Sequence, residues 1–210
     1  RGTQAEQAMS ALPLDPDEVR ACLTGTGTML PAPAYADDAV LAWERRVLFG
    51  GGWVCVGRGA DVAQARARHA VPYGEATVLL VRGDDDILRG FHNTCRHRGH
   101  ELLPCGATAH GRFIACPYHN WAYNLDGDLI GIPDKARMYP NGVDMGELGL
   151  VPIRLEVAWN KLVFGCLSHK APSFREWIGP IAERYDSYKL ESYKRYHREL
   201  DQEYPINWKA

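Results

Sequence analysis

Residues 95–121 read CRHRGHELLPCGATAHGRFIACPYHNW, and this stretch contains two short clusters of metal-binding side chains. Cys95 and His97 form the first cluster, and Cys116 and His119 form the second. The members of each pair are close enough in sequence to lie on one tight loop, and the chain between the pairs is long enough for a returning hairpin. The sequence therefore predicts a metal centre built from two loops.

Two kinds of metal centre fit these four side chains. A zinc site with two Cys and two His ligands is the commoner use of such residues. Zinc sites usually pair Cys with Cys and His with His at short spacing, whereas each loop here is mixed. Mixed loops can give both thiolates to one metal and both imidazoles to another, as in a Rieske 2Fe-2S centre. The ligand spacing favours the Rieske centre and leaves zinc as the alternative.

The residues around the four ligands carry a family resemblance. The segments 95–99 (CRHRG) and 116–121 (CPYHNW) resemble the two cluster-binding motifs of Rieske non-haem iron oxygenases. The resemblance extends over about residues 35–210 and is strongest at the two loops. It implies four ligands: Cys95 and Cys116 on the inner iron, and His97 and His119 on the outer iron.

The same resemblance assigns roles to the neighbouring residues. It implies that Gly99 lets the backbone approach the cluster sulfides and donate an N–H to them, and that Arg98 meets an acid on a neighbouring subunit. Tyr118 and Trp121 are expected to cover the cluster from solvent, with plain core packing as the alternative. One departure from the family pattern is Asn120, where many members carry Gly.

Two absent cysteines select a branch of the family. Rieske proteins of respiratory and photosynthetic complexes have a further Cys in each loop, joined by a disulfide, whereas this sequence has His100 and Tyr118 at those positions. Without that bridge and without donors near the cluster sulfurs, we expect a potential at the lower end of the Rieske range. A ferredoxin or a flavin-dependent reductase is then the expected electron donor, and not a quinol.

Composition indicates a globular chain and does not favour a negatively charged partner such as nucleic acid or a membrane surface. The 210 residues are 46% hydrophobic and 10% aromatic, which is ample for a packed core. The net charge is −2 with dispersed Lys and Arg, so neither nucleic acid nor a membrane is favoured as a partner, and the expected location is the cytoplasm. The other four cysteines are expected to be free thiols: Cys22, Cys55, Cys105 and Cys166. A role for Cys105 as a fifth metal ligand is disfavoured.

The chain reads as mainly β, with flanking helices. We expect a mobile arm over 1–34 with one helical turn near 15–23, a Rieske domain over 35–170 with cluster loops at 95–100 and 116–121, and the start of a truncated α+β catalytic domain over 171–210. Helices are predicted over 37–49, capped by Asp37 and Asp38, and over 173–190, capped by Ser173. Antiparallel strands are predicted over 53–56, 76–81, 87–91, 112–116, 150–159, 161–167 and 193–204, with a hairpin over 124–130 that closes a small cluster-binding sheet.

The sequence does not supply a second, mononuclear iron site. His92 and His97 have the spacing of two legs of a facial triad, but His97 is already assigned and Arg89 stands where the acid is required. We therefore expect the mononuclear Fe(II) in a catalytic domain missing from this sequence, which reads as a fragment or a trimmed chain. These 210 residues alone are not expected to perform oxygenation.

The resemblance implies a function for the whole protein. It implies an oxygenase that uses dioxygen and NAD(P)H-derived electrons for oxidative demethylation or hydroxylation of a small organic substrate, as a homotrimer. The contexts around residues 53–57 and 91–99 look most like the branch acting on quaternary ammonium compounds such as glycine betaine or carnitine. The alternatives are the large subunit of an aromatic-ring-hydroxylating dioxygenase and a stand-alone Rieske-type ferredoxin.

Overall fold

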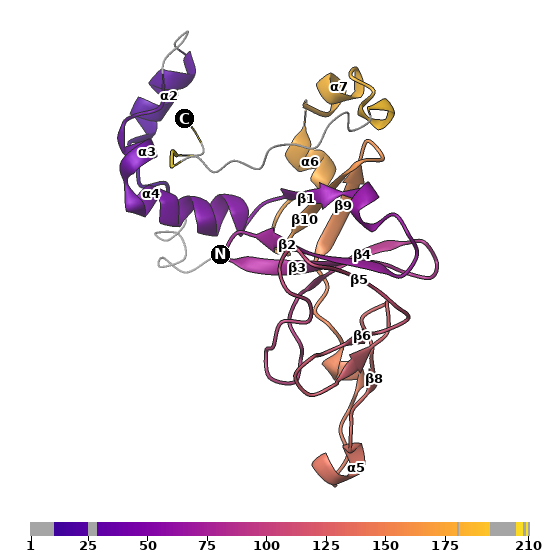
Figure 1. The fold of residues 1–210 in the computed structure, drawn as a ribbon. Helices are drawn as coiled ribbons and strands as arrows, with labels where there is room; N and C mark the ends of the chain where they lie inside the picture. The colour runs from indigo at the N-terminus through magenta and orange to yellow at the C-terminus, as the bar shows by residue number, and fades with distance from the viewer. Residues whose placement is uncertain (1–10, 25–28, 180, 194–204, 208, 210) are drawn as a thin grey trace.

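The computed structural model describes residues 11–24, 29–179, 181–193, 205–207 and 209. Three antiparallel sheets are stacked in layers, and helices lie at both ends of the chain (Figure 1). The first sheet has the order β1-β10-β9, with β1 Val54–Arg58, β10 Leu162–Cys166 and β9 Arg154–Ala158. The second has the order β4-β3-β2-β5, with β4 Leu88–His92, β3 Ala76–Arg82, β2 Ala67–Tyr73 and β5 Thr108–His110. The third has the order β6-β7-β8, with β6 Ile114–Ala115, β7 Ala122–Tyr123 and β8 Leu129–Gly131.

Strand β3 lies between two hydrophobic cores. Leu79 and Val81 point into the core shared with the small third sheet, while Val78 and Leu80 point into the core shared with the first sheet. All four side chains are fully buried. A strand covered on both faces needs an uninterrupted apolar run, which explains why its sequence does not alternate with polar residues.

The small third sheet and the two predicted metal-binding loops form a cluster subdomain, residues 93–150. Its hairpin turn meets the second sheet at Gly127, where an added Cβ would lie 2.5 Å from Cε1 of Phe91. The φ angle of Gly127 is +95°, and Asp126 beside it forms an ion pair with Arg89 of β4. Glycine is therefore required at this turn by both conformation and space.

The amino-terminal helices confirm the helix predicted over 37–49. Helix α3 (Pro33–Ala36) is followed by α4 (Asp38–Trp43), and a π-helical stretch continues it over Glu44–Phe49. The Asp37 carboxylate caps α4 by accepting from the Ala39 N–H at 2.8 Å. A further helix, α2 (Pro16–Thr24), occupies the region where one helical turn was expected.

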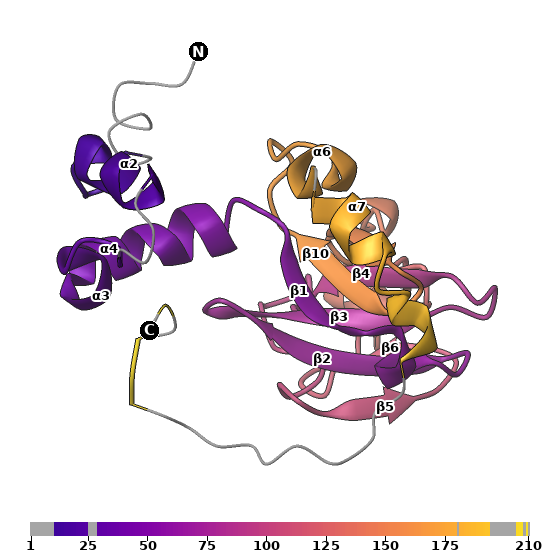
Figure 2. The same ribbon diagram turned by 90° about the horizontal axis from the view of Figure 1, so that it is seen from above.

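The described part of the carboxy terminus lies against these helices, as Figure 2 shows from above. Asn207 Nδ2 donates to the Tyr35 carbonyl at 2.8 Å. The Lys209 ammonium forms a buried ion pair with Glu44, at 2.8 Å. Segments from the two ends of the chain are thus held together by a hydrogen bond and an ion pair.

The single helix predicted over 173–190 is wrong, because the chain breaks at Gly179. Helix α6 (Phe174–Ile178) ends there, where φ is +47°, and α7 (Ile181–Asp186) follows. The predicted cap is present, since Ser173 Oγ accepts from the Glu176 N–H and Glu176 accepts from the Ser173 N–H. The strand predicted over 193–204 lies almost wholly outside the described residues, and Tyr193 ends a short 3-10 turn, Leu190–Ser192.

Strands β2 and β5 were missed by sequence reasoning. Polar residues interrupt β2, and Pro72 near its end argues against a central strand. Strand β5 accompanies β2 only along residues 67–69, so Pro72 stands at an edge where proline is tolerated. Three-residue β5 is too short for a periodic signal.

Short helical turns complete the chain: Gly59–Val62, α5 Lys135–Met138 and Gly146–Leu148. Helix α5 lies at the far end of the cluster subdomain (Figure 1). Within the described residues, no helix is both long enough and apolar enough to cross a bilayer.

Candidate metal centre

The two metal-binding loops have the same backbone hydrogen bonds. In the first loop the Cys95 N–H donates to the His100 carbonyl at 2.8 Å, and the Gly99 N–H donates to the Cys95 carbonyl at 3.0 Å. The second loop has its counterparts at the same offsets: Cys116 N–H to Trp121 carbonyl at 2.8 Å, and Asn120 N–H to Cys116 carbonyl at 3.0 Å. Each cysteine therefore anchors a closed turn of the same shape.

Both turns pass through the left-handed region at their fourth position after the cysteine. The φ angle is +72° at Gly99 and +54° at Asn120. Asparagine is one of the few non-glycine residues that adopt this conformation readily, because its short amide bonds locally. The departure from the family pattern at Asn120 is therefore conformationally compatible with the loop.

We expect Asn120→Val to destabilise the protein by about 1–2 kcal/mol, because a β-branched side chain is strained in the left-handed region. Asn120→Gly should leave the free energy of unfolding within about 0.5 kcal/mol of the parent value. Denaturant unfolding measures both. Asn141→Val is the matched control, since Asn141 is exposed and its φ is not positive; equal losses at the two positions would contradict the argument.

The two thiols are buried beside one another. Cys95 is 2% exposed and Cys116 is 1% exposed. Burial raises the pKa of the Cys95 thiol, and the adjacent Cys116 contributes to the rise, whereas the Tyr123 hydroxyl opposes it. Two sulfurs in one water-excluded place are a favourable pair of donors for a soft metal ion.

The two imidazoles form a second pair, nearer the surface. The ring centroids of His97 and His119 are 4.7 Å apart, and Trp121 stacks on His97 at 4.8 Å with an interplanar angle of 10°. Tyr118 lies over His119 at 3.7 Å. Burial, followed by the neighbouring His119 and Arg98, lowers the pKa of His97. The lowered pKa favours the neutral imidazole, which is the form that binds metals.

One ring nitrogen tests whether these donors fit a metal cluster. Nδ1 of His97 is buried and has no hydrogen-bond partner among the described residues. A buried polar atom without a partner is costly and calls for an explanation. A bond to a metal supplies that missing partner, so the residues fit a group bound between the loops.

The donors are arranged in two pairs and not around one point. Within the described ranges, no three His, Cys, Asp or Glu side chains converge as they would around a single ion. Paired thiols on the inside and paired imidazoles on the outside are the arrangement of a two-iron centre with mixed Cys and His ligation.

The other residues singled out in the sequence differ in their surroundings. Trp121 is 4% exposed and belongs to the core as well as stacking on His97, whereas Tyr118 is 55% exposed. Arg98 and Gly99 are exposed, and Arg98 makes no ion pair with any residue that the structure describes. His92, set aside as a metal ligand, is half-buried on β4, and burial lowers its pKa.

Tyr123 was missed, and it overturns one expectation. Its hydroxyl accepts from the Arg96 N–H at 3.0 Å and lies 3.2 Å from Cys95 Sγ. The hydroxyl oxygen already accepts from the Arg96 N–H, so the hydroxyl group can donate its own hydrogen to Cys95 Sγ. The expectation that no donor lies near the sulfurs is therefore wrong at Cys95. The signal was the alternation of the apolar and aromatic residues Trp121, Tyr123 and Leu125 through and beside the two-residue strand β7.

Asn93 was also missed as a positioning residue. It is 1% exposed and lies at the base of the first loop. Its Nδ2 donates to the Leu103 carbonyl at 2.6 Å, and its Oδ1 accepts from the Leu103 N–H at 3.1 Å. Nδ2 also lies 3.2 Å from Thr77 Oγ1 and 3.3 Å from Glu101 Oε1. The side chain therefore joins the two ends of the first loop to β3.

Comparison with known proteins agrees with this geometry. Residues 52–152 match the Rieske 2Fe-2S domain, and this part of the chain belongs to that family. The carnitine monooxygenase oxygenase subunit of Escherichia coli (strain K12) is 38% identical over 129 residues, which are 60% of this chain and 33% of that protein. The glycine betaine monooxygenase oxygenase subunit of Chromohalobacter salexigens is 31% identical over 167 residues, or 79% of this chain and 36% of that protein.

Solved structures give the same result. The quaternary ammonium Rieske monooxygenase CntA in its apo form superposes with a TM-score of 0.66 and 30% identity over 75% of this chain and 45% of that one. Naphthalene 1,2-dioxygenase from Rhodococcus sp. gives a TM-score of 0.72 and 25% identity over 81% of this chain and 39% of that one. The chain spans between about a third and a half of the length of the curated relatives it matches.

Proposed function

We propose that Cys95 and Cys116 hold one iron of a Rieske 2Fe-2S cluster and that His97 and His119 hold the other. The observation that carries this assignment is the separation of the donors into a buried thiol pair and an outer imidazole pair, with His97 Nδ1 lacking a protein partner. Such a cluster, when bound, takes up and releases one electron.

The surrounding residues prepare the site for electron transfer. The Tyr123 hydroxyl stabilises negative charge on the Cys95 sulfur, and Trp121 excludes water from one face of His97. A hollow of about 240 Å³ lies beside both imidazoles, with walls that include Trp121, Tyr139 and Met138 of α5. A ferredoxin or a flavin-dependent reductase that docks at this end approaches the imidazoles more closely than the buried thiols.

For the whole protein, the function we favour is oxidative demethylation or hydroxylation of a small quaternary ammonium compound, with dioxygen and NAD(P)H-derived electrons. The support is the 31–38% identity to carnitine and glycine betaine monooxygenase oxygenase subunits. The mononuclear Fe(II) would belong to a catalytic domain of the full-length protein, which we expect to be a homotrimer. A structurally related quaternary ammonium Rieske monooxygenase has given insights into inter-subunit electron transfer.

Aromatic-ring hydroxylation is the second candidate, because the Rhodococcus naphthalene dioxygenase superposes over more of the chain than CntA does. Substrate turnover by the full-length protein distinguishes the two. Stoichiometric demethylated or hydroxylated product from carnitine or glycine betaine supports the first, and a cis-diol from an aromatic hydrocarbon supports the second.

The cluster assignment is tested by elemental analysis of protein purified without oxygen. We expect about two irons and two labile sulfides per chain, with the absorption of an iron-sulfur protein. One zinc per chain with no labile sulfide would overturn the assignment and restore the zinc alternative.

We expect Tyr123→Phe to lower the midpoint potential of the cluster. In the parent protein the hydrogen bond from Tyr123 stabilises the reduced form of the cluster, which carries more negative charge on sulfur. Removing this bond therefore disfavours reduction. A differential loss of about 1.4 kcal/mol corresponds to about 59 mV for a one-electron couple. Redox titration followed by visible absorption measures the shift. Tyr139→Phe is the control, since Tyr139 packs edge-on against Trp121 and no described residue bonds its hydroxyl; an equal shift in both variants would contradict the role of Tyr123.

A further inference from the structure

Arg68 is a half-buried cation without an acidic partner. It lies on β2, on the same strand face as Ala70, which belongs to the core beneath the cluster subdomain. Burial lowers the pKa of its guanidinium, and no ion pair within the described part of the chain includes it. Nη1 donates to the Phe113 carbonyl, but Nε is buried and has no hydrogen-bond partner among the described residues. A guanidinium that is withdrawn from solvent is normally paired with an anion, and the half-buried guanidinium of Arg68 is not.

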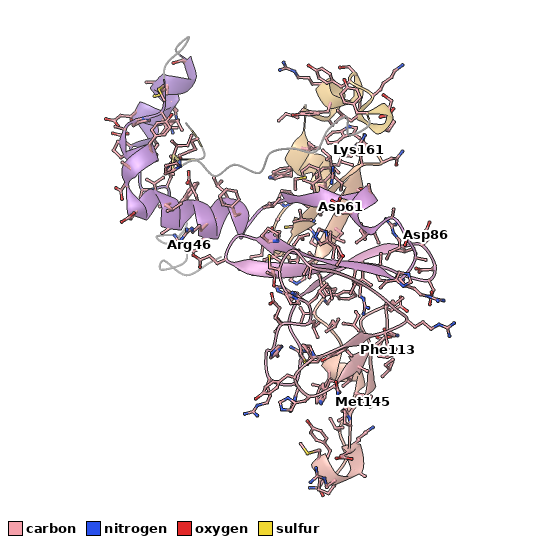
Figure 3. All side chains as sticks on the ribbon, in the orientation of Figure 1. Arg46, Asp61, Asp86, Phe113, Met145 and Lys161 are labelled. Carbon is pink, nitrogen blue, oxygen red and sulfur yellow. The ribbon has the colours of Figure 1, made fainter. Side chains whose placement is uncertain are left out.

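Arg68 borders a cavity of about 320 Å³ that contains no acidic side chain. The cavity is lined by the end of the first metal-binding loop, by the segment that enters the second and by the floor of the second sheet: Leu102, Leu103, residues 109–115, Arg68 and Leu79. Figure 3 labels Phe113 on the segment between β5 and β6. Arg112, also in the lining, is exposed and has no acidic partner in the described ranges. The cavity is therefore cationic on one side and apolar on the other.

We infer that this cavity binds a small organic carboxylate, held by the guanidinium of Arg68 and packed against Leu102, Leu103 and Phe113. A carboxylate matches the planar fork of arginine and supplies the acceptors that Nε and Nη2 lack. The volume is at the lower end of the range for small-molecule pockets, which suits a single ring or a short chain. The argument for this site does not depend on the proposed cluster, since none of the residues that line the cavity is a proposed ligand.

Occupancy of this cavity would brace both loops. Leu102 and Leu103 follow the first loop directly, and residues 113–115 lead into Cys116. A ligand that contacts both segments binds the folded arrangement and not the unfolded chain, so it should raise the thermal stability of the cluster-containing protein.

Gly111 provides a way to block the cavity without removing a charge. A Cβ added there would lie 3.2 Å from Arg68 Nη2, which is closer than ordinary contact. Gly111→Ala should therefore crowd the guanidinium edge that the carboxylate uses, and because φ is +158° there it should also strain the backbone, which the thermal midpoint without ligand reports.

The test is isothermal titration calorimetry of benzoate into the cluster-containing protein, with benzamide and inorganic phosphate as comparison probes. We expect saturable binding of benzoate. Benzamide lacks the charge and phosphate lacks the apolar body, so each should bind at least about tenfold more weakly. Benzoate and benzamide of equal affinity, phosphate at least as tight as benzoate, or no saturable binding of benzoate, would each overturn the proposal.

Variants locate the binding. Arg68→Gln should abolish benzoate binding, and Gly111→Ala should weaken it at least about tenfold, while Arg137→Gln on α5 removes an equal charge elsewhere and should change nothing. Iron content and the thermal midpoint without ligand report whether each variant is folded. If Arg68→Gln does not fold, Arg68→Lys, which keeps the charge without the fork, and Gly111→Ala decide the matter. Parent affinity in the folded Arg68 variant, or in Gly111→Ala, would refute the site.

Discussion

Replacing Cys116 with alanine should abolish cluster binding. The side chain is 1% exposed and adjoins Cys95, so its loss removes a thiolate that no water molecule from bulk solvent can replace. Iron and labile sulfide should fall from about two each per chain to near zero, with loss of the visible absorption. Because metal binding contributes to folding free energy, the thermal midpoint should fall as well. Visible absorption, elemental analysis and calorimetry measure the three effects.

The other cysteines provide matched controls. Cys166 is as buried as Cys116 but lies in the separate core with Trp53 and Phe164, and Cys105 is exposed. Cys166→Ala should lower stability by about 1 kcal/mol through lost packing and keep the iron content of the parent. Cys105→Ala should change neither, and a loss of iron in it would revive the fifth-ligand alternative. Full iron content in Cys116→Ala would sink the proposed ligand set.

Asn93→Ala should destabilise the protein by about 3 kcal/mol or more. The change leaves the Leu103 N–H and carbonyl without their bonds to the side chain, and each unpaired buried group costs about 1–3 kcal/mol. Because the first metal-binding loop loses its attachment to β3, iron should also be released faster from the folded variant. Denaturant unfolding and the rate of iron transfer to a chelator measure the two effects.

Asn93→Asp changes only one half of this interaction. Aspartate keeps the acceptor for the Leu103 N–H, loses the donor to the Leu103 carbonyl and brings a buried carboxylate next to Glu101, so it should cost at least as much as Asn93→Ala. The exposed Asn141→Ala is the control and should stay within about 0.5 kcal/mol of the parent. A similarly small effect for Asn93→Ala would show that water replaces its partners.

The sequence was most informative where the signal is local. The four proposed ligands follow from two short motifs, and the cap at Ser173 follows from one turn of chain. Strands β3 and β4 were recognised from their short β-branched runs, and β9 and β10 from their alternating residues. These elements can be predicted from short stretches of sequence, without knowing which distant residues contact them.

What was missed depends on residues far apart in the sequence. Tyr123 reaches Cys95 across 28 positions, and only the folded sheet brings the hydroxyl to the sulfur. The polar sequence of β2 becomes a strand because β3 and β5 pair with it, and not through its own propensity. The break at Gly179 had a local signal, a Gly-Pro pair, but the apolar spacing on both sides concealed it.

The pairing of β1 with β10 places Val54 opposite Gly165, so the chain forms the whole cluster subdomain between these two neighbouring strands. Such a contact between sequence-distant residues closes a long loop, and its entropic cost is met only after the intervening chain is compact. The hairpin of β2 and β3 turns within a few residues and is free to form early. We therefore expect the first sheet to be completed late in folding, so that β1 remains available for intermolecular strand pairing while the intermediate persists.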